Sequence, residues 1–256
     1  PPGRIDGGEI LFEGDDLLKM DEDRLRGVRG NRIAMIFQDP MSSLNPVHTV
    51  GFQVAEPLRI HRGMNERGAL ARCVELFRSL RISEPRERLG QYPHQFSGGM
   101  RQRVVSAMAL ACSPRVMIAD EPTSNLDVTI QVQLMDLYRR IQEETGLAIL
   151  LITHDLGVAA SICNRVAVMY AGRVVEQAPV NDLFARQRHP YTKGLLACTP
   201  NAGRDIAESG ARKALYTIPG SVPPITNLPK GCAFEPRCSY AVDACRALPP
   251  PLTAME

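Results

Sequence analysis

Two neighbouring carboxylates directly follow a short apolar segment of this chain. Asp120 and Glu121 come after residues 116–119, which read Val-Met-Ile-Ala, and a proline comes next. Carboxylates at the end of a buried strand cost free energy unless they coordinate a metal ion or take part in a reaction. Asp120 is therefore expected to hold Mg²⁺ directly or through water. Glu121 is expected to polarise the water that attacks a phosphoryl group.

A glutamine and a histidine stand in the same position after two other apolar segments. Gln38 follows residues 33–37, and its amide oxygen could coordinate Mg²⁺ or hold a water, although a glutamine at a strand end is more often simply solvated. His154 follows residues 147–153 and could hydrogen-bond a terminal phosphate and its attacking water. Ligands bind at the carboxyl ends of strands in open α/β sheets. All these polar side chains are therefore expected to converge on one edge of a sheet.

A glycine pair lies at the predicted start of a helix. Residues 96–103 read Phe-Ser-Gly-Gly-Met-Arg-Gln-Arg, and Ser97 is a typical helix N-cap. Gly98 and Gly99 would let backbone N–H groups approach a ligand, and the positive end of the helix dipole attracts anions. The same residues could form an ordinary cap with a flexible entry loop, so the phosphate-binding interpretation depends on the rest of the pattern.

The apolar spacing predicts the elements that position these residues. Apolar runs predict buried strands at 33–37, 116–119 and 147–153, and residues spaced three and four apart predict helices. Strands that alternate with helices indicate an α/β fold with a mainly parallel sheet and helices on its faces. The predicted helical ranges are 49–89, 97–112 and 128–144, and hairpins are predicted at 9–18 and at 166–175. Prolines crowd the last sixty residues, where turns and extended chain should dominate.

Composition excludes several classes of protein. The chain has 256 residues, of which 44% are hydrophobic and 23% charged, as in an ordinary globular protein. Its 30 basic and 28 acidic residues leave a net charge of +2, too balanced to indicate a nucleic-acid surface. The longest apolar run, around residues 147–152, is far shorter than the ~20 residues needed to span a bilayer. No signal peptide opens the chain.

The seven cysteines are scattered, which argues against a disulfide framework and for a reducing compartment. Four stand alone and are expected to be small buried hydrophobic residues, namely Cys73, Cys112, Cys163 and Cys198. Cys232, Cys238 and Cys245 lie in the proline-rich tail, where their spacing suggests thiolate ligation that staples a loop. Free structural thiols are an equal alternative.

Taken together, these motifs resemble those of ATP-binding-cassette (ABC) ATPases over residues 5–180. The matching residues, in order, are Gln38 of the Q-loop, Ser97, Gly98, Gly99 and Gln102 of the signature, Asp120-Glu121 at the end of a strand, Asp127 of the D-loop, and His154 of the His-loop. The resemblance implies that Glu121 is the catalytic base and that His154 stabilises the γ-phosphate. It also implies that Gln38 and Asp120 attend Mg²⁺, and that the signature acts in trans on ATP held by a second ATPase subunit.

One expected motif is missing from the sequence. ABC ATPases cradle the β- and γ-phosphates with a P-loop, Gly-x-x-x-x-Gly-Lys, but none of the four lysines follows a glycine. In the family this loop precedes the segment that resembles residues 5–18, and the chain starts at Pro1 without an initiator methionine. We therefore expect a chain truncated before or within its P-loop region, and also at its C-terminus. The 256 residues alone are expected to show no ATPase activity.

The tail narrows the resemblance to the ATPase subunits of bacterial dipeptide, oligopeptide and nickel importers. Residues 189–196, His-Pro-Tyr-Thr-Lys-Gly-Leu-Leu, and the cysteine-bearing stretch 231–238 resemble those proteins. The resemblance implies permease subunits as partners, a solute-binding protein as an indirect partner, and a place on the cytoplasmic face of the bacterial inner membrane. Some relatives carry an iron–sulfur cluster at these cysteines. The alternative is a cassette ATPase of DNA repair or translation. Such a protein would be expected to show a basic patch, tandem cassettes or a coiled-coil insertion, and this sequence shows none of them.

The predicted organisation has four segments. Residues 1–48 would form the remainder of the N-terminal ATPase core with the Q-loop, and 49–95 a helical subdomain that docks on membrane subunits. Residues 96–180 would hold the signature helix and the catalytic core, and 181–256 the importer-type C-terminal extension.

Overall fold

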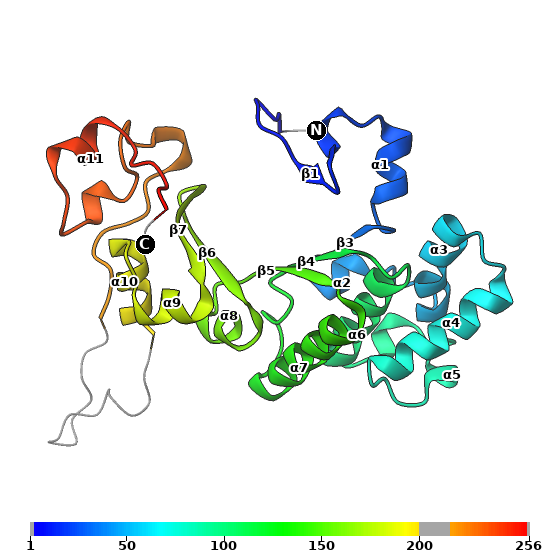
Figure 1. The fold of residues 1–256 in the computed structure, drawn as a ribbon. Helices are drawn as coiled ribbons and strands as arrows, with labels where there is room; N and C mark the ends of the chain where they lie inside the picture. Colours follow the sequence, from blue (N-terminus) through cyan, green and yellow to red (C-terminus); the bar gives the residue numbers. More distant parts are fainter. Residues whose placement is uncertain (1–2, 200–215, 255–256) are drawn as a thin grey trace, which may run out of the picture. The chain divides into compact units, whose positions relative to one another are not determined.

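A computed structural model describes residues 3–199 and 216–254 (Figure 1). The chain divides into two compact units, Pro1–His154 and Asp155–Glu256, which are described separately below. The predicted segment 96–180 spans this division. Part of the predicted extension, residues 200–215 and 255–256, lies outside the described residues, as do the first two residues of the predicted start.

The first unit is built on a three-stranded parallel sheet with the order β3-β4-β5. Its strands are β3 (Ile33–Ile36), β4 (Val116–Asp120) and β5 (Ala148–Ile152). The register pairs Ile36 with Ala119, and Asp120 with Ile152, so the carboxyl ends of all three strands are level. The predicted strands and their parallel arrangement are therefore confirmed.

Two helices lie on one side of this sheet, α6 (Gly98–Leu110) and α7 (Val128–Thr145) (Figure 1). They bury Ala34, Ile36 and Met117 on the covered face. The other face is open: Met35 is 41% exposed, and Leu150 is 56% exposed. The prediction of fully buried strands was wrong for this face, because an apolar run alone does not tell whether one or both faces of a strand are covered.

A helical subdomain follows β3 and the short helix α2 (Pro40–Ser43). It contains α3 (Val50–Arg62), α4 (Glu66–Ser79) and α5 (Pro85–Arg88), followed by the 3₁₀ turn η2 (Pro93–Gln95). Thr49 and Asn65 cap α3 and α4 by accepting backbone N–H groups, and Gly63 ends α3 in the left-handed conformation. The helices predicted within 49–89 are thus confirmed, with turns between them.

The loop between α2 and α3 is fixed by one buried amide. The side chain of Gln53 accepts the N–H of Asn45 at 2.8 Å and donates to the carbonyl oxygens of Asn45 and His48, each at 3.0 Å. These bonds therefore fix the connection that leads from α2 into the helical subdomain.

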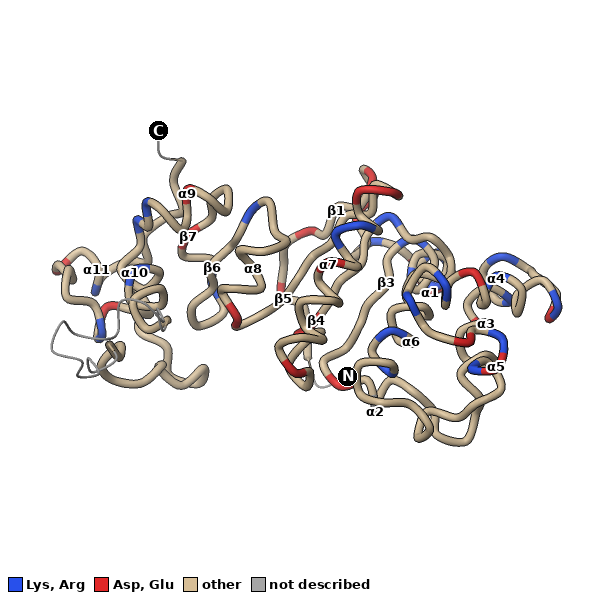
Figure 2. Tube along the Cα trace, turned by 90° about the horizontal axis from the view of Figure 1, so that it is seen from below, with Lys and Arg blue, Asp and Glu red and all other residues tan. Residues whose placement is uncertain are grey.

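The N-terminal part of the first unit is a small hairpin and a helix. Strands β1 (Leu11–Phe12) and β2 (Asp15–Asp16) pair antiparallel, as predicted, and are followed by η1 (Leu17–Lys19) and α1 (Glu22–Val28). Glu13, in the hairpin turn, forms ion pairs with Arg32 and Arg115. Along this part of the chain the acidic residues come mostly first, in residues 6–23, and the basic residues follow in residues 24–32 (Figure 2).

The second unit begins with α8 (Leu156–Ile162) and the antiparallel hairpin β6 (Arg165–Tyr170) and β7 (Arg173–Pro179). Helices α9 (Val180–Ala185) and α10 (Pro190–Ala197) follow. The tail contributes η3 (Ile225–Asn227), η4 (Glu235–Arg237) and α11 (Asp243–Ala247), so turns dominate there as expected.

The tail is attached to this hairpin by one arginine and an aromatic cluster. Arg237 donates to the carbonyl oxygens of Ile218 and Pro219 and to the hydroxyl of Tyr170. The rings of Tyr170 and Phe234 meet edge to face, 5.2 Å between centroids. In the described parts of the chain, no helix has the length and apolar character needed to cross a bilayer.

Candidate active site

The polar residues predicted to converge do so at the carboxyl edge of the β3-β4-β5 sheet. Gln38 follows β3, Glu121 follows β4 and His154 follows β5, and the level register brings the three positions together. Gln38 donates from Nε2 to Oε2 of Glu121 at 2.8 Å, and Nδ1 of His154 lies 3.0 Å from Oε1 of Glu121. Each oxygen of the carboxylate is thus held by a different strand end.

The exposure of these side chains fits a reactive site. The side chain of Glu121 is 25% exposed, whereas that of His154 is 75% exposed. The carboxylate is therefore held at the base of the site, while the imidazole remains open to a ligand. Asp120 is half-buried at the last position of β4, beside Glu121.

The backbone of Glu121 has an unusual conformation. Its φ is 43°, in the left-handed region that side chains other than glycine seldom adopt. The turn that follows includes Pro122 and brings the chain into α7, with Asp127 as N-cap accepting the N–H of Ile130 at 3.0 Å. Sequence reasoning did not detect this conformation, since neither residue type nor spacing reports φ.

The signature residues form a second surface of the first unit. The side chain of Ser97 caps α6 by accepting the N–H of Met100 at 3.4 Å. A cavity of about 500 Å³ lies beside this cap. The cavity is lined by the signature loop, the loop before α7 and the turn after α4. The lining residues are Ser97, Gly98, Gly99, Met100 and Arg103; Asn125, Leu126, Asp127 and Ile130; and Arg81, Ile82 and Ser83. The predicted D-loop and signature residues therefore share one cavity, and Gln38, Glu121 and His154 are not among its lining residues.

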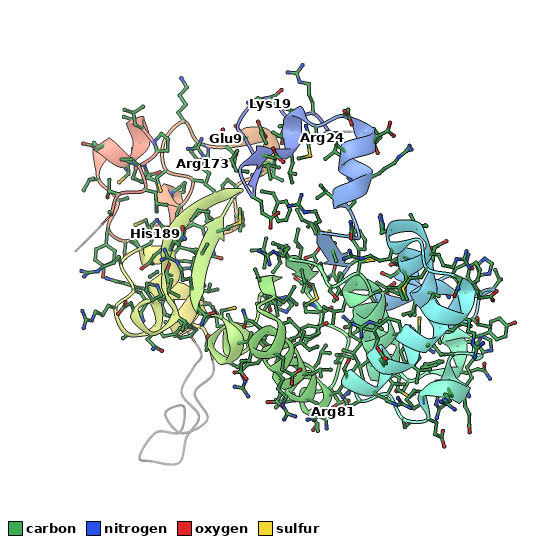
Figure 3. All side chains as sticks on the ribbon, turned by 45° about the vertical axis from the view of Figure 1, so that its right-hand side comes forward. Glu9, Lys19, Arg24, Arg81, Arg173 and His189 are labelled. Carbon is green, nitrogen blue, oxygen red and sulfur yellow. The ribbon has the colours of Figure 1, made fainter. Side chains whose placement is uncertain are left out.

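The two arginines of this cavity were not singled out from the sequence. Arg81 is labelled in Figure 3 and stands at the end of the turn after α4, with a φ of 55°. Arg103 donates to the carbonyl oxygen of Leu80 at 2.8 Å and to Gln133 at 3.3 Å. Burial lowers the pKa of Arg103, and the positive charge of Arg81 lowers it further. The sequence pattern does not give the turn after α4, so it could not predict that Arg81 lies close enough to act on Arg103.

The two signature glycines differ in their surroundings. A Cβ atom on Gly99 would lie 2.7 Å from Cγ2 of Ile130 in α7, so the close approach of α6 and α7 requires glycine there. A Cβ atom on Gly98 would meet no atom within 4 Å. Nothing within the described chain therefore requires the absence of a side chain at Gly98.

Gln102 does not share the signature surface. Only 1% of it is exposed, and it lies inside the first unit one turn before Ser106. The hydroxyl of Ser106 donates to the carbonyl oxygen of Gln102 and lies 2.8 Å from the hydroxyl of Tyr138. The expectation that Gln102 binds a nucleotide does not fit this burial, because position 102 falls on the covered face of α6.

The cysteines follow their predictions only in part. Cys73 and Cys112 are buried as expected, and burial raises the pKa of Cys73 to about 12. Cys163 and Cys198 are only partly buried. The backbone N–H of Cys232 donates to the carbonyl oxygen of Cys245 at 2.8 Å.

The three tail cysteines do not gather into a metal-binding group within the described residues. Among the residues that the structure describes, no three Cys, His, Asp or Glu side chains gather in a way that could hold a metal ion. Cys232, Cys238 and Cys245 therefore do not fit the ligand set of an iron–sulfur cluster, which requires converging thiolates.

Comparison with known proteins agrees with this arrangement. Residues 3–124 match the family described as "ABC transporter", and residues 175–245 match "Oligopeptide/dipeptide transporter, C-terminal region". A peptide import ATP-binding protein of Brucella melitensis is 54% identical, over 99% of this chain and 77% of that protein. The dipeptide transport ATP-binding protein of Escherichia coli is 45% identical, over 99% of this chain and 76% of that protein.

Solved structures of ATP-binding cassettes are also similar to this chain. A dimeric, post-hydrolysis state of an ATP-binding cassette bound to ADP and Pi superposes with a TM-score of 0.61 and 30% identity, over 68% of this chain and 74% of that chain. The structure of cbiO1 of Clostridium perfringens, part of the ABC transporter complex cbiONQ, also gives a TM-score of 0.61, with 28% identity over 71% of this chain and 70% of that chain. The chain therefore belongs to the ABC transporter ATPases, and within them to the oligopeptide/dipeptide importer type.

Proposed function

We propose that this chain is part of an ATP-binding and hydrolysing subunit that energises the import of peptides, or of a related solute, through a bacterial ABC transporter; its 256 residues contain no P-loop and are proposed to be inactive alone. The names of its relatives support peptide import. The observation that carries the reaction is the carboxylate of Glu121, held at the sheet edge by Gln38 on one oxygen and by His154 on the other.

Glu121 acts as the general base. A carboxylate oxygen can accept two hydrogen bonds, so each oxygen of Glu121 keeps a lone pair beside the bond that it already accepts. One of these lone pairs takes a proton from the attacking water. The oxygen of that water then bonds to the γ-phosphorus as the bond from phosphorus to the ADP oxygen breaks, which gives ADP and phosphate.

His154 links the base to the phosphate. Its Nδ1 faces Glu121, and the exposed remainder of the ring can direct Nε2 at an oxygen of the γ-phosphate. When both nitrogens carry protons, the ring donates to the carboxylate and to the phosphate at the same time. This orients the base and stabilises the negative charge that develops on the phosphoryl group.

Asp120 and Gln38 are suited to attend Mg²⁺. Magnesium sites at phosphates need only one or two protein oxygens, since water and the phosphates supply the other ligands. Asp120 offers a carboxylate next to Glu121, and Gln38 donates through its nitrogen, which leaves its amide oxygen for the ion. Bound Mg²⁺ would neutralise charge on the β- and γ-phosphates.

The signature cavity serves a second ATPase subunit. Ser97, Gly98 and Gly99 are accessible at the start of α6, and Asp127 lines the same cavity. Helix N-termini with free backbone N–H groups bind phosphates. Since the cavity excludes the residues around Glu121, the signature is proposed to close over ATP held by the partner, which is either identical or a paralogue.

The remaining partners follow from the family. The helical subdomain at residues 49–95 is proposed to dock on the permease subunits, with a solute-binding protein as an indirect partner and no nucleic acid. The chain is accordingly proposed to lie at the cytoplasmic face of the bacterial inner membrane. The proposed cofactors are ATP and Mg²⁺. Iron analysis and the visible absorption spectrum of anaerobically purified protein test whether the tail cysteines ligate a cluster.

The substitution Glu121→Gln tests the proposal. It keeps the shape of the side chain but removes the base, so ATP hydrolysis should stop while ATP binding persists. The measurement uses the protein as encoded in its genome, reconstituted with its permease in vesicles. Glu143→Gln, on the exposed side of α7, is the matched control. Turnover of the Glu121→Gln protein near the unsubstituted rate would refute Glu121 as the base.

A further inference from the structure

The left-handed backbone of Glu121 sets it apart from similar positions in the described chain. The other non-glycine residues with positive φ lie in hairpin turns or at helix ends, namely Glu13 and Ala171 in turns and Arg81, Glu84 and Ser113 beside helices. Glu121 instead continues directly from a strand of the parallel sheet. A side chain in this conformation persists only where its surroundings hold it.

Three hydrogen bonds hold the two peptide groups of Glu121. Its N–H donates to the carbonyl oxygen of Ile152 in β5 at 2.9 Å. Its own carbonyl oxygen accepts the backbone N–H of Ser124 at 3.2 Å and the hydroxyl of Ser124 at 3.1 Å. The sheet thus fixes one side of the residue, and within the described chain the two bonds from Ser124 fix the other.

We infer that Ser124 is a positioning residue for the catalytic base. The orientation of the two peptide groups sets the direction of the Cα–Cβ bond, and this direction decides whether the carboxylate reaches Gln38 and His154. The backbone bond from Ser124 is of a kind that many tight turns have, whereas the hydroxyl adds a second bond to the same oxygen. Loss of the hydroxyl should let the carbonyl of Glu121 rotate and should misalign the carboxylate. The inference rests on the proposed role of Glu121.

Ser124→Ala tests the inference in the reconstituted transporter. We expect kcat to fall about fivefold, the effect of one ordinary hydrogen bond of about 1 kcal/mol, with no change in KM for ATP. Ser124→Thr keeps the hydroxyl and should restore kcat. The matched control is Ser161→Ala, because Ser161 is also exposed and donates in the same way to a carbonyl three residues earlier, that of Val158, at 2.8 Å.

The outcomes separate this inference from the proposed function. If Glu121→Gln stops hydrolysis but Ser124→Ala leaves kcat unchanged, only the positioning role of Ser124 is overturned. The same conclusion follows if Ser124→Thr fails to restore kcat, or if KM rises as much as kcat falls. If Glu121→Gln leaves hydrolysis intact, the proposed role of Glu121 as the base is refuted, and the inference about Ser124 is refuted with it.

Discussion

The two signature glycines should respond to alanine in opposite ways. Gly98 has open space where a Cβ atom would lie, and Gly99 has Cγ2 of Ile130 only 2.7 Å away. Alanine has the higher helix propensity, so Gly98→Ala should leave the free energy of unfolding unchanged or raise it by up to about 1 kcal/mol. Gly99→Ala must displace a side chain between two helices, which costs about 1–3 kcal/mol.

Gly98→Ala should affect ATPase activity much more than it affects stability. A methyl group at Gly98 would stand where a phosphate is proposed to approach the start of α6, and a misplacement of about 1 Å can cost about 10²-fold in rate. Gly98→Ala should therefore lose most ATPase activity while its stability is kept. Urea unfolding of the purified chain and ATPase assays of the reconstituted transporter measure the two quantities separately.

A double substitution provides the control. Ile130→Ala removes Cγ2, so Gly99→Ala combined with Ile130→Ala should be less destabilising than the sum of the two single changes. If Gly98→Ala destabilises the chain as much as Gly99→Ala, the reasoning from local space is refuted. Full activity of Gly98→Ala would refute the proposed approach of phosphate at that residue.

Two further predictions concern buried groups. Burial raises the pKa of Tyr138 to about 12, above its unfolded value near 10. The stability that neutral Tyr138 contributes is therefore complete below pH 10 and is lost as the pH rises toward 12. In urea unfolding, the stability advantage of the unsubstituted protein over Tyr138→Phe should shrink by about 1 kcal/mol between pH 8 and pH 11. An advantage that stays constant would contradict this. Glu176 is buried and accepts the N–H groups of Arg188 and His189, at 2.7 and 3.0 Å, where α10 begins (Figure 3 labels His189). Glu176→Ala should therefore cost about 1–3 kcal/mol in the second unit, whereas Glu235→Ala, which removes a carboxylate bonded only to a side chain, should cost less.

Which side chains meet at the sheet edge could be predicted, because each of them directly follows an apolar run that predicts a strand. Strands of parallel sheets end at one edge, so the apolar runs before Gln38, Glu121 and His154 already indicate that these side chains meet. The hydrogen bonds at 2.8 and 3.0 Å confirm that expectation geometrically. Their catalytic roles stay proposals that Glu121→Gln tests.

Three other features could not be predicted from the sequence, and each has a physical reason. Gln102 lies next to exposed signature residues in sequence, but the period of the helix turns its side chain inward toward Tyr138. The exposure of Leu150 depends on which elements cover the sheet, and an apolar strand looks the same in either case. The backbone conformation of Glu121 depends on a turn closed by Ser124, which residue type alone does not specify.

The backbone of Glu121 also has an evolutionary consequence. A left-handed residue with a side chain costs about 1–2 kcal/mol relative to glycine, so glycine or asparagine would fold better at this position. Selection for folding alone, for example by display of a variant library and proteolysis, should therefore enrich glycine or asparagine at position 121. Selection for growth on imported solute should instead retain glutamate. The difference between the two enrichments would measure how much stability this protein gives up in order to carry its base.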